Sequence, residues 1–124
     1  MNEGGQMGRV TEEFRGRTKR YAADIIRLYV KLPKTREEVR VLGSQLLRSG
    51  TSVGAHVREA GRARSRDEFI SKLGGAAQEA DESLLWLELL REECGMDSTL
   101  LLEAESNELL SILTTIIKRT KEKS

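Results

Sequence analysis

The chain has 124 residues, of which 38% are hydrophobic, 4% are aromatic and one is proline, and this composition suits a single helical domain rich in leucine and alanine. Its one cysteine, Cys94, excludes an internal disulfide, and the amino-terminal residues have neither the basic start nor the apolar run of a signal peptide. The apolar run at residues 109–117 is far shorter than a membrane-spanning helix. We therefore expect a cytoplasmic protein that does not enter a membrane.

The net charge of +1 conceals two halves of opposite sign. Residues 1–66 carry fifteen bases and seven acids, whereas residues 67–124 carry six bases and thirteen acids. Oppositely charged halves attract each other, within one chain or between chains. A basic surface is also typical of proteins that meet an anionic partner.

Residues 1–8 are rich in glycine and predict a disordered tail, which leaves residues 9–124 for one folded domain. The first helix of this domain is predicted over residues 10–32, because apolar side chains recur there at steps of three and four and a proline follows. Ile26 and Tyr29 belong to a second apolar stripe on this helix. We therefore expect the helix to bury more than one face.

The second helix is predicted to begin at Thr35, where Thr35 and Glu38 form a capping box, and to end near Gly61. Three glycines lie inside it, and each costs about 1 kcal/mol relative to alanine in a helix. Close approach of another helix would offset that cost. The three glycines are Gly43, Gly50 and Gly54.

The third helix is predicted to begin after Ser65, which forms a second capping box with Glu68, and to end at Gly95. Between residues 84 and 90 only Glu88 is polar, and a helix that is apolar nearly all round is buried on more than one side. In a domain of this size, such burial points to contacts between subunits. The candidate oligomer interface consists of Ile26, Tyr29, Leu85, Trp86 and Leu89.

The fourth helix is predicted over residues 98–121, with Asp97 as its cap. Four helices of similar length with short connections predict an all-α fold, an antiparallel up-down-up-down four-helix bundle. In the hairpin of the second and third helices, Gly50 and Gly54 are expected opposite residues 74–77, where small side chains allow close packing. The same hairpin predicts an ion pair between Arg48 and the carboxylates of Glu79 and Glu82.

Three stretches of the chain resemble a known bacterial family. Residues 42–56, with the sequence LGSQLLRSGTSVGAH, are similar to the centre of the four helix bundle protein family. Its members are also called intervening-sequence proteins, because some are encoded in insertions within large-subunit ribosomal RNA genes. Residues 65–73 and 79–90 match as well, and with the junction at residues 32–35 the resemblance covers nearly the whole chain after the tail.

The resemblance implies a four-helix protomer assembled with copies of itself as a ring-like homopentamer. The chain is also similar to the accessory proteins of diversity-generating retroelements, which are pentameric and basic and bind nucleic acid and a reverse transcriptase. The implied partners are therefore the protein itself, RNA or DNA, and a partner protein such as a reverse transcriptase. The family carries no catalytic residues that could be transferred to this chain.

The residues offer little for catalysis. His56 is the only histidine, and Val53 stands where a di-iron bundle would need the glutamate of its Glu-x-x-His motif. A zinc site built on histidines or a catalytic triad has too few parts, and no phosphate-binding glycine motif is present. We expect neither an enzyme nor a cofactor or metal.

Clustered bases are the strongest candidates for function, because such clusters can contact phosphates in a salt-dependent manner. They can also be a solvated face or an intersubunit contact with the acidic half. We expect a non-catalytic oligomeric module that binds RNA or DNA weakly; the alternative is a protein-interaction adaptor with no nucleic-acid role. The candidate nucleic-acid-binding residues are Arg20, Arg27, Lys31, Arg58, Arg62, Arg64 and Arg66.

Overall fold

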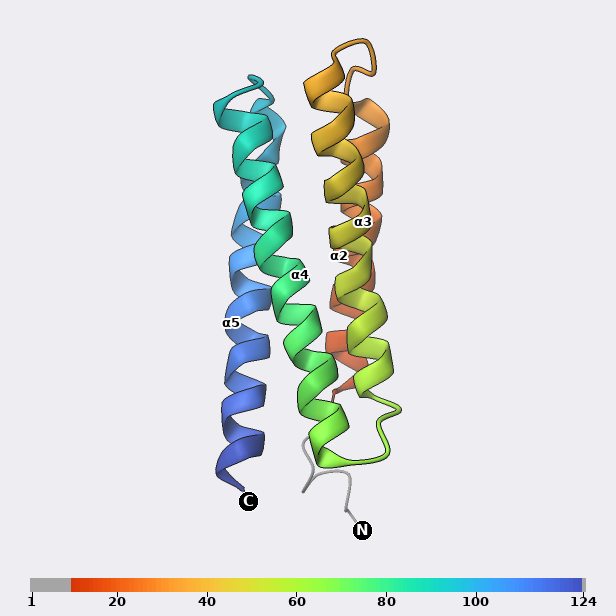
Figure 1. The fold of residues 1–124 in the computed structure, drawn as a ribbon, viewed down its shortest axis with the longest axis vertical. Coiled ribbons are helices and arrows are strands. Elements are labelled where there is room, and N and C mark those ends of the chain that lie inside the picture. The colour runs from red at the N-terminus through yellow and green to blue at the C-terminus, as the bar shows by residue number, and fades with distance from the viewer. Residues whose placement is uncertain (1–9, 124) are drawn as a thin grey trace.

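The computed structural model describes residues 10–123, which form an all-α bundle without strands in that range (Figure 1). The predicted tail at residues 1–8 lies outside the described residues. The predicted all-α, up-down-up-down architecture is confirmed. Its long helices are α2 (Glu12–Lys31), α3 (Glu37–Ala60), α4 (Arg66–Glu92) and α5 (Leu100–Glu122), and the short 3-10 helix η1 (Asp97–Thr99) precedes α5.

The four helices form two hairpins that lie side by side (Figure 1). α3 packs extensively on α2 and on α4, and α4 packs on α5, whereas α2 and α5 touch little. α2 and α4 therefore occupy diagonal corners of the bundle, and the seam between α2 and α5 is its most open side. The core is built from the apolar stripes of all four helices, including Ile25, Leu46, Val53, Leu73, Leu87, Leu109 and Leu113.

The predicted start of α4 is confirmed. The Ser65 hydroxyl accepts a hydrogen bond from the Glu68 backbone N–H at 3.0 Å, and the Glu68 carboxylate accepts one from the Arg64 N–H at 2.9 Å. These two bonds satisfy amides that have no partner inside the helix. The reciprocal bond reaches one residue further back than the standard capping box.

The predicted capping box at Thr35 is wrong. α3 begins at Glu37 after Arg36, and no side chain caps it. The Glu38 carboxylate instead holds the Arg36 guanidinium at 2.9 Å. A charged hydrogen bond of this kind is stronger than one from a neutral amide, so Glu38 does not reach back to Thr35.

The predicted cap at Asp97 is also wrong. Asp97 lies inside η1, and α5 begins only at Leu100 without a side-chain cap. Thr99 is the residue before α5, and its hydroxyl donates to the Glu103 carboxylate at 2.8 Å. The turn between α4 and η1 depends on Gly95, whose φ of +77° lies in the left-handed region that glycine adopts without strain.

The glycines of α3 face α2, so the predicted contact of Gly50 and Gly54 with residues 74–77 is wrong. A Cβ atom at Gly50 would lie 2.8 Å from Cγ1 of Ile25, and one at Gly54 would lie 3.6 Å from the backbone oxygen of Thr18. The neighbouring position turns toward α4 instead, where the Ser49 and Ser83 hydroxyls lie 2.7 Å apart. Successive side chains of a helix point in directions about 100° apart around its axis. The glycines therefore lie on the flank of α3 away from α4.

Candidate nucleic-acid interface

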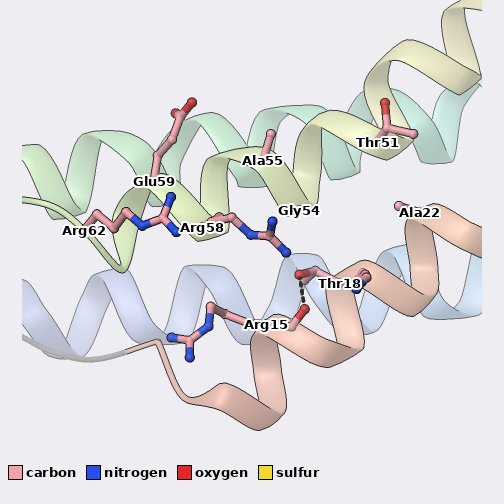
Figure 2. A pocket seen from close by; sticks show the side chains of 10 residues that line it. Arg15, Thr18, Ala22, Thr51, Gly54, Ala55, Arg58, Glu59 and Arg62 are labelled. Carbon is pink, nitrogen blue, oxygen red and sulfur yellow. Dashed lines mark hydrogen bonds between the residues drawn. The ribbon is translucent and has the colours of Figure 1, made fainter.

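A groove of about 500 Å³ runs between the outer flanks of α2 and α3, near the end of the bundle where α2 begins and α3 ends (Figure 2). Bases from both helices line it, Arg15 and Lys19 from α2 and Arg58 and Arg62 from the end of α3 and the turn after it. The remaining lining residues are small or polar: Thr18, Ala22, Thr51, Gly54, Ala55 and Glu59.

Small side chains keep the floor of this groove open. Gly54 lets α3 approach the backbone of α2 at Thr18, and Ala22 and Ala55 are too short to fill the space above. The Thr18 hydroxyl donates to the carbonyl oxygen of Arg15 at 3.0 Å, the bond that Figure 2 marks. The long arginine side chains therefore stand around a shallow, largely apolar floor.

Among residues 10–123, Glu59 is the only acid that lines the groove, and it is turned away from the arginines (Figure 2). Its carboxylate lies 3.2 Å from the Lys72 ammonium and 3.4 Å from Nδ1 of His56. The hydrogen bond from Lys72 is the main cause that lowers the pKa of Glu59. This carboxylate therefore stays ionised and bonded to Lys72, on the side of α4.

The groove bases are consequently left without acidic partners. Within residues 10–123, Lys19, Arg58 and Arg62 form no ion pair, and Arg15 donates only to the backbone oxygen of Val10 at 3.3 Å. Arg58 and Arg62 also lie at the carboxyl end of α3, where positive charge complements the helix dipole. That structural role does not apply to Arg15 and Lys19, which lie in the amino-terminal half of α2.

The predicted bases of α2 lie on the opposite flank of the helix from Arg15 and Lys19. Arg20, Arg27 and Lys31 line a second hollow of about 600 Å³ between α2 and α5. Arg27 pairs with Asp24 at 2.9 Å. The predicted set is therefore divided between two faces and does not form one patch.

Arg64 lies in the connection from α3 to α4 and Arg66 is the first residue of α4, at the same end of the bundle as the groove (Figure 1). The Arg64 side chain is almost fully exposed and approaches the Glu68 carboxylate at 3.8 Å. Arg66 is half-buried, and its Nε has no hydrogen-bond partner among residues 10–123.

Sequence reasoning missed Arg15 and Lys19. Both follow the flank of α2 that carries Thr18 and Ala22, which the helical period places beside the glycine-bearing flank of α3. The periodicity could have indicated them. It did not, because the predicted packing placed the glycines against α4.

The predicted partners of Arg48 lie beside it. Its guanidinium is 2.8 Å from Glu82 and 3.4 Å from Glu79, across the contact of α3 with α4. His56 packs its ring against Gly75 of α4, where an added Cβ would lie 3.2 Å from the ring. Both arrangements hold the α3–α4 pair in register.

The predicted interface residues differ in how much they expose. Ile26 and Leu85 are 45% and 46% exposed, whereas Leu89 is half-buried. Tyr29 packs against the α3 backbone at Gly43 and carries the Lys34 ammonium 4.4 Å from its ring centre. Trp86 is half-buried, with an indole N–H that has no partner among the described residues.

Neither a metal cluster nor a membrane segment is found in the described part of the chain. Among residues 10–123, no three histidine, cysteine, aspartate or glutamate side chains are placed to hold a metal ion. No helix in the same range is both long and apolar enough to cross a membrane.

The sequence matches the 23S rRNA-intervening sequence protein family over residues 13–121, which takes in nearly all of the four long helices. The chain belongs to this family. The predicted resemblance to the intervening-sequence proteins is thereby confirmed. The match includes the groove, the Arg48 cluster and the exposed apolar residues.

A solved relative of this intervening-sequence protein shows the same fold. The crystal structure of a protein of unknown function from the S23 ribosomal protein family of Bacteroides thetaiotaomicron is 38% identical, with a TM-score of 0.77. The alignment covers 84% of this chain and 97% of that chain. A comparison with curated proteins finds no match.

Proposed function

We propose that this 23S rRNA-intervening sequence protein is a non-catalytic module that assembles with copies of itself and binds the phosphate backbone of RNA or DNA weakly in the α2–α3 groove. The observation that carries the proposal is the group of four bases around the groove, none of which is neutralised by an acid among residues 10–123. The name of the family also connects its members with ribosomal RNA.

The groove suits phosphates better than bases. Guanidinium groups bind phosphate oxygens through paired N–H donors, and two helices contribute them here from opposite sides. No aromatic side chain of the described bundle lines the groove, and Phe14, Tyr21 and Phe69 are buried in the core, so base stacking has no platform there. Binding should therefore depend on charge and not on sequence.

Net positive charge and exposed apolar side chains gather at opposite ends of the bundle. The end that holds the groove, made of residues 10–20, 51–78 and 109–123, carries thirteen bases and six acids. The other end carries seven bases and thirteen acids, and it holds the large apolar side chains that are most exposed. Those side chains are Ile26, Val30, Val41, Leu85, Leu100 and Leu101.

This polarity supports both parts of the proposal. Assembly through the apolar end leaves the basic end of every copy free. Copies held side by side then present their grooves together, and repeated weak sites bind a long polymer much more tightly than one site does.

The test is the affinity for a short RNA duplex and for a single strand, measured by fluorescence anisotropy over a series of salt concentrations. We expect R58A/R62A to weaken binding roughly tenfold at low salt and to reduce the slope of log K against log salt by about one for each phosphate that the variant no longer binds. The matched control is K34A/R40A, which removes the same charge from the other end of the bundle.

Equal losses for the two double variants would show that net charge alone attracts the nucleic acid, and the groove would lose its role. Absence of binding by the unmodified protein at about 50 mM salt would overturn the nucleic-acid part of the proposal, because electrostatic binding is strongest at low salt. Comparison of duplex with single strand then identifies the preferred form.

A second candidate function is a protein-interaction adaptor without nucleic acid. The observation that favours it is Leu101, which is 87% exposed at the edge of the hollow between α2 and α5. Replacement of Leu101 by Lys should abolish capture of such a partner and leave RNA binding unchanged. Loss of RNA binding in this variant would instead tie Leu101 to the first function.

A further inference from the structure

Two apolar patches lie on the outward sides of α2 and α4. Ile26 and Val30 are one helical turn apart on α2 and are 45% and 70% exposed, and they form the α2 patch. Leu85 and Leu89, one turn apart on α4, form the α4 patch; Leu85 is 46% exposed and Leu89 is half-buried. None of these four residues belongs to the buried set of its helix, although α2 and α4 each bury a largely apolar core face in the described bundle.

The two patches are held apart within one copy. α2 and α4 stand at diagonal corners of the bundle, since each packs on α3 but they do not pack substantially on each other. One copy therefore cannot bring its own two patches together. A patch on one copy can meet only a patch on another.

The patches also lie at the same height along the bundle. Ile25 contacts α3 at Gly50, and Ser49, the residue before Gly50, reaches Ser83 of α4. Ile26 is therefore nearly level with Ser83 and lies within about one helical turn of Leu85. Copies that join through these patches need no shift along the helix axes.

The charges around the two patches are opposite in sign. Residues 20–34 around the α2 patch carry four bases and one acid, whereas residues 78–92 around the α4 patch carry five acids and one base. Asp81 is exposed and forms no ion pair within residues 10–123, and Lys31 is likewise exposed and unpaired. An apolar centre with complementary charges at its edge is the usual anatomy of a specific protein interface.

We infer that the α4 patch of one copy binds the α2 patch of the next copy. This inference rests on the self-assembly in the proposed function and adds which faces meet. The contact is heterologous, because two different surfaces join, and a joined pair keeps one free α2 patch and one free α4 patch for further copies. A contact without a shift along the axes is the condition for a closed ring, whereas a shift at each step would give a helical filament.

The test uses two double variants, each of which disables one patch with a charge that its partner repels. I26E/V30E places two acids opposite the acidic α4 patch, and D81K/L85K places two bases opposite the basic α2 patch. We expect light scattering to give 13.9 kDa, the mass of a single chain, for each variant alone. L101K is the control, because Leu101 is even more exposed but lies on α5, and it should keep the mass of the unmodified protein.

Mixing the two double variants distinguishes a heterologous contact from a symmetric one. Each variant retains the patch that the other has lost, so the mixture should form a 1:1 complex or a larger assembly. A mixture that stays at 13.9 kDa, or a variant that keeps the parent mass, would overturn the inference. Circular dichroism melting confirms that each variant is folded.

The outcome for the unmodified protein separates this inference from the proposed function. A single-chain mass for the unmodified protein would overturn the self-assembly itself. An assembly that persists in both double variants would leave self-assembly intact and show that other faces carry it.

Discussion

The hydroxyl oxygens of Ser49 and Ser83 lie 2.7 Å apart, and both residues are fully buried between α3 and α4. Ser83 also donates to the Glu79 carbonyl at 2.8 Å, so it accepts the hydrogen bond from Ser49. Within residues 10–123, the one other acceptor of the Ser49 hydroxyl is the Leu46 carbonyl, at 3.4 Å. The bond between these serines thus fixes one point of the α3–α4 register inside the core.

This bond predicts unequal effects for the two alanine substitutions. S49A should lower the free energy of unfolding by about 1 kcal/mol, since Ser83 keeps its donor bond to Glu79. S83A should cost more, about 1–3 kcal/mol, because the buried Ser49 hydroxyl loses its best acceptor. Urea unfolding checks this order. The loss in S49A/S83A should be smaller than the two single losses added together, and strict additivity would contradict the coupling.

The glycines of α3 and α4 predict opposite effects of the same substitution. G50A should destabilise the protein by about 1–3 kcal/mol, because the new Cβ would lie 2.8 Å from Ile25 in a packed contact. G74A is the matched control, since nothing lies within 4 Å of its Cβ, and it should stabilise by up to about 1 kcal/mol through helix propensity. Thermal melting of both variants checks the pair. A stabilised G50A would show that α2 and α3 are packed loosely.

The buried Glu103 predicts a loss of stability in acid. Hydrogen bonds from Arg91 at 2.7 Å and from Thr99 lower the pKa of this carboxyl, with Arg91 as the larger cause. Its stabilising effect is therefore complete above the pKa of the unfolded chain, about 4.3, and is lost as the pH falls through the lowered pKa of the folded state.

E103Q tests this pH dependence. The variant should be less stable than the parent by about 1–3 kcal/mol at pH 7, because it weakens a charged hydrogen bond, and the difference should shrink toward pH 3. Urea midpoints at several pH values measure it. E108Q is the control, since Glu108 is exposed and lies 3.9 Å from Arg17; its effect should stay within about 0.5 kcal/mol at every pH. A constant gap for E103Q would assign the effect to packing.

The pairing of Arg48 with two acids predicts a modest effect of charge reversal. R48E places three carboxylates together at a half-exposed site, and we expect a loss of about 0.5–1 kcal/mol that decreases at high salt. Adding E82R should recover part of the loss by reversing the pair. A melting temperature that does not change in R48E at low salt would mean that the pair contributes nothing to stability.

The sequence alone determined the helices, their order and much of the core. Apolar residues at steps of three and four define an inward stripe on each helix, and this period is a property of the local chain. The Ser65 cap was equally predictable, because its partner Glu68 is only three residues away. At Thr35 the same local pattern failed, since Glu38 binds the neighbouring Arg36 instead.

The tertiary structure decided which flank of each helix meets which neighbour. A periodic stripe shows that a residue faces inward, but a rotation of about 100° separates the side of α3 toward α2 from the side toward α4. Gly50 and Ser49 differ by one position and contact different helices for this reason. The same rotation separates Arg20 from Lys19 and brings Lys19 and Arg15 to the groove, because only the packed bundle selects the bases that share a face.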